Sequence, residues 1–434
     1  MAGFIRKSED MGKTRTSNER QQSNEKQKSC ESVKIGRLHK MEKTKTERLQ
    51  WILDDAVARG EIPGATLLVR KDGKEEVYLE SGYADIEAKK PVARDSIYRL
   101  YSMSKPITAV AVMLLAERGQ IDLADPVCRY LPGFCGQLVA YADGRVEKPW
   151  RDVNIQDLLN MTSGLVYEGN HPAGRQTEAL FEEITQRLDE GEGGRYGTVE
   201  IANRLGRIPL AFQPERSWCY GTSADVAGAV VEVVSGMRFG DFLEKELFAP
   251  LEMCDTGFWV PEEKKDRLVK TYVCTEGETP ALYTKNHLDI CNRMDRRPAF
   301  ESGGAGLVST IDDYSHFAQM LLNGGSYKGK QILGSSVVEF LTGHVLSECQ
   351  QKVFEREGMP WLEGFSYGNF MRVMTDPRRA CTLGSQGEYG WDGWLGCYFA
   401  NAPKDRMTVL MMTQKTDAGT FRMTRLLRNV IYNL

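Results

Sequence analysis

The sequence predicts an α/β fold of the α+β type: an antiparallel sheet built from both ends of the chain, flanked by helices, with an inserted helical domain. Two observations support this prediction. Hairpin patterns occur near each end of the chain, over residues 65–82 and 396–414. Apolar residues at helical spacing dominate the long stretch between them. One sheet to which both ends contribute is a simple way to bury the apolar faces of these elements.

Residues 1–40 are expected to form a disordered polar tail. They are rich in Lys, Glu, Gln, Ser, Asn and Arg and nearly free of large apolar residues. Such a segment cannot bury enough apolar surface to offset the entropy of ordering it. Its positive charge leaves binding to an acidic partner as an alternative to a solvated segment. The predicted domain is 41–434, with 41–110 and 305–434 in the sheet-containing part and 111–304 as the mainly helical insertion.

The N-terminal part of the domain begins with a helix and a hairpin. Apolar residues recur at helical spacing over 49–57, and Gly60 stops the run. Two segments of strand character follow, Ala65–Lys71 and Glu75–Gly82. The Asp72-Gly73 dipeptide between them is a strong hairpin signal, because both residues tolerate the positive φ of a tight turn.

Capping patterns place the later elements. Asn154, with Asp157 three residues on, predicts the start of a helix over Ile155–Met161. Thr310 with Asp313 predicts another helix, which runs through Leu322. The remaining expected elements are a helix over Gly221–Ser235, a hairpin that turns at Pro403–Asp405 and a helix over Thr420–Ile431.

Composition limits the classes of function. There are 56 basic and 60 acidic residues, for a net charge of −4, which gives no strong overall field for nucleic acid. The ten cysteines are scattered without a C-x-x-C pair, as in proteins of reducing compartments. No secretory signal is visible, and the longest apolar stretch, near Ile107–Ala116, is far shorter than the ~20 residues of a membrane helix. We therefore expect a cytoplasmic protein that binds neither nucleic acid nor a membrane.

Two kinds of chemistry find no support in the motifs. The five histidines include no H-E-x-x-H pattern, so a zinc hydrolase is not indicated and no metal ligands are predicted. The run Gly324–Lys330 resembles a phosphate-binding loop. However, it lacks the Ser or Thr that must follow the Lys, and it comes after a helix where a strand is required.

The segment Ser102-Met103-Ser104-Lys105 offers a nucleophile and a base. A serine hydroxyl needs a base within hydrogen-bond reach, and residues three apart on a helix share a face, so Ser102 and Lys105 can meet. Pro106 is tolerated only near a helix start, which places Ser102 at the N-terminus of the helical run Ile107–Glu117. Ser104 lies about 200° around the helix axis from Ser102 and is the weaker candidate.

Longer segments around this motif resemble a known family, the penicillin-recognising serine β-lactamase-like proteins. The segment YRLYSMSKPITAVAVMLLAERGQIDLADPVCRYLP is similar to the nucleophile-bearing helix of class C β-lactamases and of the related family VIII esterases and transacylases. The similar segments occur in the same order along this chain as in the family. The other similar segments are VNIQDLLNMTSGL (153–165), WCYGTSADVAGAVVEVVSG (218–236), ESGGAGLVSTIDDYSHFAQMLLNGG (301–325) and GWDGWLGCYFANAPKDRMTVLMMTQ (390–414).

The resemblance implies a β-lactamase/transpeptidase-like fold and a set of roles. Ser102 would be the acylated nucleophile, and Lys105 the base or proton shuttle beside it. Tyr220 would be the second acid/base, which protonates the leaving group and activates water. It would be a tyrosinate only if a cation such as Lys105 stabilised it. The backbone N–H groups of Ser102 and Trp394 would form the oxyanion hole.

The sequence departs from the family pattern at two motifs. The second motif has Thr222 where β-lactamases usually carry Asn. The third motif usually begins with Lys, but here it reads Trp391-Asp392-Gly393. We predict that these residues and Trp218 bind substrate, with Trp391 offering an apolar face and one N–H donor. Asp392 would repel anionic substrates if it faced the cleft; the alternative is a solvated turn residue.

The implied activity is a carboxylesterase that forms an acyl-serine intermediate from small neutral esters. A transacylase of the same fold is an alternative, followed by a β-lactamase or D-Ala-D-Ala peptidase. A catalytically inactive relative that only binds ligands is the non-enzyme alternative. The resemblance implies no metal or organic cofactor, and the expected partner is a small-molecule acyl substrate. The oligomeric state stays open.

Overall fold

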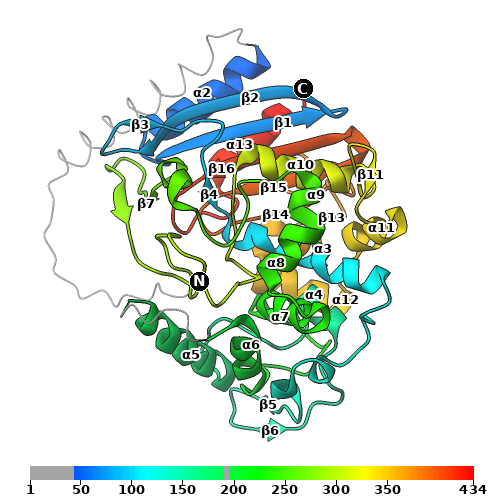
Figure 1. Cartoon of the computed structure of the whole chain (residues 1–434). Coiled ribbons are helices and arrows are strands. Elements are labelled where there is room, and N and C mark those ends of the chain that lie inside the picture. Colours follow the sequence, from blue (N-terminus) through cyan, green and yellow to red (C-terminus); the bar gives the residue numbers. More distant parts are fainter. Residues whose placement is uncertain (1–43, 190–195) are drawn as a thin grey trace, which may run out of the picture. The chain divides into compact units, whose positions relative to one another are not determined.

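One antiparallel sheet organises the computed structural model, which describes residues 44–189 and 196–434. The tail predicted for residues 1–40 lies outside the described residues. Residues 48–434 form one compact unit. Two strands distant in sequence, β1 (Gly64–Lys71) and β16 (Met407–Thr413), pair inside the sheet, in a register that sets Leu68 opposite Leu410 (Figure 1). The predicted antiparallel sheet with strands from both ends of the chain is therefore confirmed.

The sheet has eight strands in the order β12-β13-β14-β15-β16-β1-β2-β3. Both predicted hairpins are present, because β1 pairs with β2 and β15 pairs with β16. The other bounds are β2 (Lys74–Asp85), β3 (Lys90–Pro91), β12 (Phe365–Gly368), β13 (Met371–Met374), β14 (Tyr389–Asp392) and β15 (Tyr398–Ala402).

Helices cover both faces of the sheet, and the strand alternation decides which residues meet them. Along a strand, successive side chains point to opposite faces. Leu67 packs with Leu427 of α13 (Arg422–Ile431) and with buried residues of α2 (Lys45–Ala58). Leu68 belongs instead to the large core with Phe317 of α10 (Ile311–Leu322). The large core that contains Leu68 and Phe317 continues into the helical part of the protein.

Helices dominate the part of the chain between these strands. The capping prediction at Asn154 is confirmed, because its side chain accepts a hydrogen bond from the Asp157 N–H at 2.8 Å. The helices are α3 (Ser104–Glu117), α4 (Ile155–Asn160), α5 (Pro172–Asp189), α6 (Thr198–Gly206), α7 (Ser223–Ser235), α8 (Phe239–Leu243) and α9 (Ala249–Leu251), followed later by α11 (Ser335–Gly343) and α12 (Glu348–Val353).

Four pairs of short strands complete the structure. One pair, β4 (Tyr98–Arg99) with β9 (Val308–Ser309), lies immediately before the Ser102 segment and ties it to the stretch before α10. The others are β5 (Val139–Ala140) with β6 (Val146–Glu147), β7 (Thr271–Val273) with β8 (Ala281–Tyr283), and β10 (Ser326–Tyr327) with β11 (Lys330–Gln331). None of the helices in the described ranges has the length and apolarity needed to span a membrane.

Candidate active site

Ser102 lies in a turn of 3-10 helix, Tyr101–Met103, directly before α3. The expected α-helical start at Ser102 is therefore wrong by two residues. Ser102 and Lys105 still meet across the junction with α3, because residues three apart lie on the same side in both kinds of helix. Tyr101 has a φ of 46°, a left-handed conformation that non-glycine residues adopt mainly where the surroundings impose it. Among residues 96–115, Ser102 is the only one that is not buried.

Lys105 is fully buried, and its amine has three polar neighbours. Nζ lies 3.1 Å from the Oγ of Ser102, 2.8 Å from the carbonyl oxygen of Gly304 and 3.3 Å from the hydroxyl of Tyr167. Burial lowers the pKa of Lys105 to about 7, against the opposing effect of the Asp225 carboxylate. A substantial fraction of the amine is therefore neutral at neutral pH.

The three neighbours can also satisfy the neutral form of the Lys105 amine. A neutral amine has two N–H donors and one lone pair. The carbonyl of Gly304 can only accept, and the hydroxyl of Tyr167 can accept the second N–H. The lone pair is then left for the hydroxyl hydrogen of Ser102. The geometry thus places a base at the nucleophile.

The ring of Tyr220 also lies close to this amine. Its ring centroid is 4.7 Å from the Nζ of Lys105, and its hydroxyl accepts a hydrogen bond of 2.9 Å from the indole N–H of Trp391. Burial raises the pKa of Tyr220, although the hydroxyl of Ser102 and the indole of Trp391 lower it in part. The phenol therefore keeps its proton at neutral pH, which does not favour the tyrosinate.

Asp225 of α7 fixes the carbonyl that holds Lys105. Its carboxylate accepts hydrogen bonds from the hydroxyl of Ser302 at 2.5 Å and from the N–H of Gly304 at 3.0 Å. A Cβ on residue 304 would lie 3.0 Å from that carboxylate and 3.2 Å from the hydroxyl of Tyr167. A larger residue at this position would therefore push against both side chains, which favours glycine. Sequence reasoning missed Tyr167, Asp225 and Gly304 as site residues, and the glycine run at 303–304 was the available signal.

The end of β14 lies against the turn that carries the nucleophile. A Cβ on Gly393 would lie 2.2 Å from the carbonyl oxygen of Leu100, so only glycine fits. Trp391 is 2% exposed, and its single N–H is already bonded to Tyr220. Trp394 is half-buried, and its ring contacts Tyr101 with centroids 5.0 Å apart. Oxyanion binding by the backbone of this residue stays a prediction.

Asp392 points away from Trp391. Its cross-strand partner Tyr398 belongs to the core on the α13 face, whereas Trp391 belongs to the other core. The carboxylate of Asp392 accepts a hydrogen bond from the hydroxyl of Thr420 and lies 3.8 Å from the buried guanidinium of Arg372. The solvated-turn interpretation is therefore wrong, because Asp392 ends a strand and is surrounded by protein.

Two other predicted substrate-binding residues are buried. Thr222 is fully buried as the residue before α7, and its hydroxyl has no hydrogen-bond partner among the described residues. Trp218 is 3% exposed and packs edge-on against the rings of Phe354 and Tyr367. Their contact with substrate stays a prediction, whereas Ser102, Lys105, Tyr220 and Trp391 are brought together.

Other serines in suggestive patterns are not nucleophiles in this geometry. The segment Gly364–Gly368 matches the G-x-S-x-G motif, but Ser366 lies inside β12 with 2% exposure. Its hydroxyl accepts a hydrogen bond from the N–H of Leu346 at 3.0 Å. Ser104 is fully buried, and its hydroxyl accepts from the N–H of Leu307 at 3.1 Å. Both hydroxyls therefore anchor backbone.

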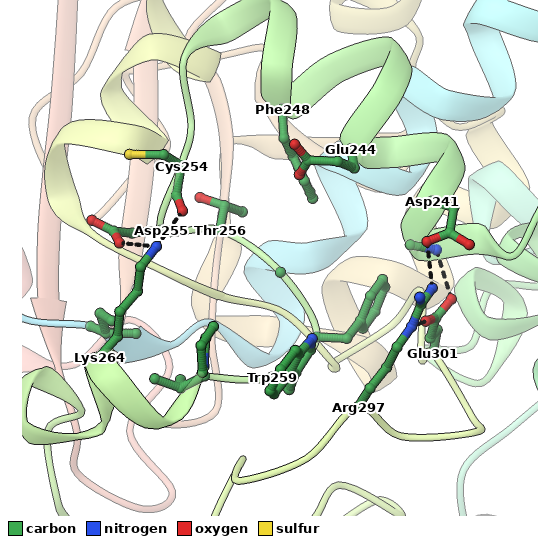
Figure 2. Close-up of a pocket in the computed structure, with 16 residues that line it drawn as sticks. Asp241, Glu244, Phe248, Cys254, Asp255, Thr256, Trp259, Lys264, Arg297 and Glu301 are labelled. Atoms are coloured by element: carbon green, nitrogen blue, oxygen red, sulfur yellow. Dashed lines mark hydrogen bonds and ion pairs between the residues drawn. The ribbon is translucent and has the colours of Figure 1, made fainter.

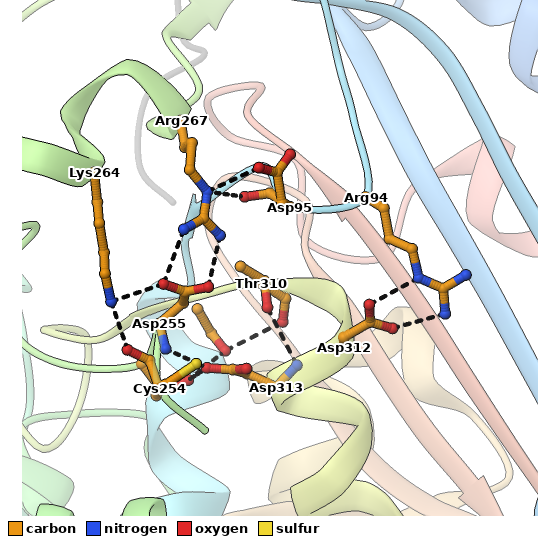
Figure 3. Close-up of polar contacts among 11 residues, drawn as sticks. Arg94, Asp95, Cys254, Asp255, Lys264, Arg267, Thr310, Asp312 and Asp313 are labelled. Atoms are coloured by element: carbon orange, nitrogen blue, oxygen red, sulfur yellow. Dashed lines mark hydrogen bonds and ion pairs between the residues drawn. The ribbon is translucent and has the colours of Figure 1, made fainter. Parts of the chain in front are cut away.

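A separate polar cluster brings possible metal ligands together. Atoms of Cys254, Asp255 and Asp313 lie within 4.8 Å of one another (Figure 3). However, the carboxylate of Asp255 already binds Arg267 at 2.6 Å and Lys264 at 2.9 Å. A cation would have to displace these positive side chains. In addition, the N–H of Asp255 donates to the carboxylate of Asp313 at 2.7 Å, which fastens the segment after α9 to the start of α10.

A cavity of about 210 Å³ lies beside this cluster (Figure 2). Arg297 crosses one wall, with ion pairs to Asp241 at 2.7 Å and to Glu301 at 3.0 Å. None of Ser102, Lys105 and Tyr220 lines it. It is therefore distinct from the site built around the nucleophile.

Comparisons with known proteins agree with this geometry. Residues 49–431 match the family model described as Beta-lactamase. An uncharacterized protein of Mycobacterium tuberculosis is 30% identical over 364 residues, which covers 82% of this chain and 86% of that protein. Esterase EstB of Burkholderia gladioli is 29% identical over 399 residues, which covers 89% of this chain and 94% of that protein.

A solved structure shows the same arrangement of elements. EstCE1, described as a hydrolase with promiscuous acyltransferase activity, superposes with a TM-score of 0.74 at 27% identity. The similarity covers 89% of this chain and 98% of that one. The predicted β-lactamase/transpeptidase-like fold is confirmed, and this chain belongs to the beta-lactamase family.

Proposed function

We propose that this protein is a carboxylesterase that cleaves small neutral esters through a covalent acyl-Ser102 intermediate. The observation that carries the proposal is the Lys105 amine, which lies 3.1 Å from the Oγ of Ser102 and has its pKa lowered to about 7. A base poised near the working pH is best suited to take up a proton and return it. The partner is a small-molecule acyl substrate.

In the acylation step, Lys105 takes the hydroxyl proton of Ser102 as Oγ forms a bond to the ester carbonyl carbon. The carbonyl oxygen becomes an oxyanion, which the N–H groups of Ser102 and Trp394 would stabilise. The C–O bond to the alcohol then breaks, and the phenol of Tyr220 donates its proton to the departing oxygen. Tyr220 regains a proton from the Lys105 ammonium, whose Nζ lies 4.7 Å from the centroid of the phenol ring.

Deacylation repeats these transfers with water in place of the alcohol. Lys105 accepts the proton of water through the hydroxyl of Tyr220, while the water oxygen attacks the acyl carbon. The bond to Oγ of Ser102 breaks, and Oγ regains its proton from Lys105. The bond from the Trp391 N–H occupies one lone pair of the Tyr220 hydroxyl, which leaves its hydrogen free to point toward the reacting atoms.

Two observations support neutral esters over β-lactams or D-Ala peptides. The third motif begins with Trp391 and therefore lacks the Lys that meets the substrate carboxylate in β-lactamases. In addition, esterase EstB is among the relatives that match most of this chain. Acyl transfer to an acceptor other than water is a second candidate, because the structurally similar EstCE1 is a hydrolase with promiscuous acyltransferase activity.

The test combines a covalent probe with a panel of p-nitrophenyl esters. Intact mass after incubation with a fluorophosphonate should show one adduct, and peptide mapping should place it on Ser102. Ser102→Ala should abolish labelling and lower turnover by roughly 10³-fold or more, since nucleophile and base act as a unit. Ser104→Ala is the matched control and should still be labelled.

The outcomes separate the alternatives. Labelling that persists in Ser102→Ala and disappears in Ser104→Ala would contradict the assignment of the nucleophile. Adduct formation without ester turnover would indicate a binding protein with a reactive serine. If added alcohols divert most of the acyl group from water, acyl transfer is the main reaction.

A further inference from the structure

An aromatic stack lies beside the nucleophile, on the side of Trp394. The rings of Trp394 and His287 lie face to face, with centroids 4.0 Å apart and an interplanar angle of 28°. Trp394 also contacts the rings of Tyr101 at 5.0 Å and Tyr283 at 5.6 Å. Because Tyr101 directly precedes Ser102, this stack borders the turn that presents the nucleophile. A substrate group bound on this side would meet the partly exposed rings of Trp394 and His287.

A strained turn presents His287 to the indole. The N–H of His287 donates to the carbonyl of Ile290 at 3.3 Å, and the N–H of Ile290 donates back at 3.0 Å. Between them, Leu288 and Asp289 have φ values of 51° and 60°. Two successive positive φ angles are typical of a type I′ turn, which Gly, Asn and Asp usually fill. A leucine persists there only when the surroundings hold it.

Tertiary contacts hold the turn in place. The carboxylate of Asp289 accepts a hydrogen bond of 3.0 Å from the hydroxyl of Thr185 on α5. Ile290 is 6% exposed and packs in a small core with Tyr101 and Leu395. The position of His287 is therefore fixed from two directions, which is unusual for a residue on a loop.

Asp289 of the same turn is buried, and burial raises its pKa to about 8, so it also changes charge near neutral pH. Of the rings in the stack itself, His287 is the one that can gain a positive charge as the pH falls. The charged residues that act on it are Asp417, which also accepts the indole N–H of its ring partner at 2.8 Å, and Glu168. Both acids raise the pKa of His287, but burial outweighs them and lowers it below the ordinary value. The pKa values of Tyr101 and Tyr283 are raised, so these phenols stay neutral.

We infer that His287 is a specificity-determining residue for the substrate group that lies against Trp394. Neutral His287 and Trp394 together favour an uncharged aromatic group, because aromatic rings pack well on one another. Protonated His287 adds a positive charge, which attracts a carboxylate on that group. The charge preference of the site therefore changes with pH. The kinetic part of this inference rests on the proposed esterase function.

The test uses ester pairs that differ by one carboxylate. Phenyl acetate and 4-acetoxybenzoate carry the difference on the alcohol side, and methyl benzoate and monomethyl terephthalate carry it on the acyl side. The ratio of kcat/KM, charged over neutral, is measured from about pH 5 to pH 8. Protonation of Lys105 slows both members of a pair equally, so it cancels in the ratio. For at least one pair, the ratio should rise about three- to tenfold as the pH falls.

Two variants assign the effect to His287. His287→Phe keeps an aromatic ring on Trp394 but cannot titrate, so its ratio should stay flat across the pH range. His316→Phe is the matched control, because His316 is also close to an aromatic ring (Tyr327, 5.1 Å) and burial also lowers its pKa. In this control, the ratio should change with pH as it does in the wild-type protein.

A binding measurement keeps the inference separate from the esterase proposal. Ser102→Ala protein should bind the same esters without cleaving them, and calorimetry gives Kd at the two ends of the pH range. A preference for the charged ester that grows at low pH and disappears in Ser102→Ala/His287→Phe supports the inference even if the wild type shows no turnover. A pH-independent preference overturns it. A pH effect that persists without His287, or failure of all four esters to bind, also overturns it.

Discussion

The two sides of Ser102 consist of different kinds of chemical groups. On one side, a buried amine, a phenol and a backbone carbonyl meet at fixed hydrogen-bond distances, and Asp225 of α7 holds the carbonyl in place. On the other side, the half-buried rings of Trp394 and His287 come from loops and present an aromatic surface. Under the proposed function, proton transfer and substrate selection would be carried out by separate groups of residues. A change of charge on the aromatic side need not disturb the amine.

Trp391 and Trp394, which are three positions apart, differ in the same way. Trp391 is 2% exposed and donates its N–H to the phenol of Tyr220. Trp394 directs its N–H to Asp417 and leaves its ring partly exposed. One tryptophan therefore belongs to the proton-transfer side and the other to the selectivity side. Changes to each should have different kinetic signatures.

The largest expected effect is on the proton-transfer side. Lys105→Met should lower turnover of neutral esters by roughly 10³-fold, because it removes the base and leaves the shape similar. In the wild-type protein, kcat/KM for a neutral ester should rise with pH through about 7, since the protonated amine has no lone pair. A stopped assay across the pH range checks both. A profile that falls through pH 7 would show that the lysine acts in its charged form.

A smaller effect is expected for substrate charge. Above pH 7, kcat/KM for a short p-nitrophenyl ester should exceed that for nitrocefin by about ten- to a hundredfold, because a charge-assisted contact worth about 1.5–3 kcal/mol is missing at Trp391. Low and moderate salt should be compared, since a charged contact weakens as salt rises. Equal turnover of nitrocefin would indicate that another cation has replaced the Lys of the third motif.

Two buried tryptophans provide a matched comparison. Trp391→Phe should reduce kcat about tenfold, because it removes the hydrogen bond to Tyr220, worth about 1–1.5 kcal/mol. Trp218→Phe is the control, since the N–H of Trp218 is buried and has no partner among the described residues. Both variants lose ring volume, so both should unfold at a lower urea concentration than the wild-type protein. Only Trp391→Phe should lower kcat. Equal kcat losses would mean that packing, not the N–H, matters.

The smallest effect on activity is expected at Asp392. Asp392→Asn should change turnover of neutral esters less than about twofold, because the side chain lies on the far face of β14. It should instead lower the free energy of unfolding by about 1–3 kcal/mol, because the buried guanidinium of Arg372 loses its counter-charge. Urea titration measures this. Asp376→Asn is the control, because its partner Arg378 is 90% exposed, and it should leave the midpoint unchanged.

Local patterns predicted much of the fold and half of the site. The Asp72-Gly73 turn and the Asn154 cap depend on residues two or three apart, and both are found as expected. The Ser102–Lys105 pair has the same local character. Tyr167 and Gly304 contact the same amine from 62 and 199 residues away in the sequence. The spacing of apolar residues along the chain does not predict contacts of this kind.

The aromatic side was less predictable for the same reason. The placement of His287 depends on a turn whose left-handed residues include a leucine, which no turn propensity would select. The face on which Asp392 lies depends on the strand register, which a motif alone does not give. The sequence therefore predicted the contact between Ser102 and Lys105, but it did not predict the aromatic surface formed by Trp394 and His287.

The pairing of β1 with β16 has a consequence for synthesis of the protein. The partner of Leu68 is Leu410, so an inner edge of the main sheet stays open until residues 407–413 leave the ribosome. At about 5–20 residues per second, this interval lasts roughly 20–70 s. During that time the apolar strand β1 exposes an unpaired edge, which is a template for aggregation. Yield should therefore depend on chaperone supply, and most strongly in a host that translates slowly.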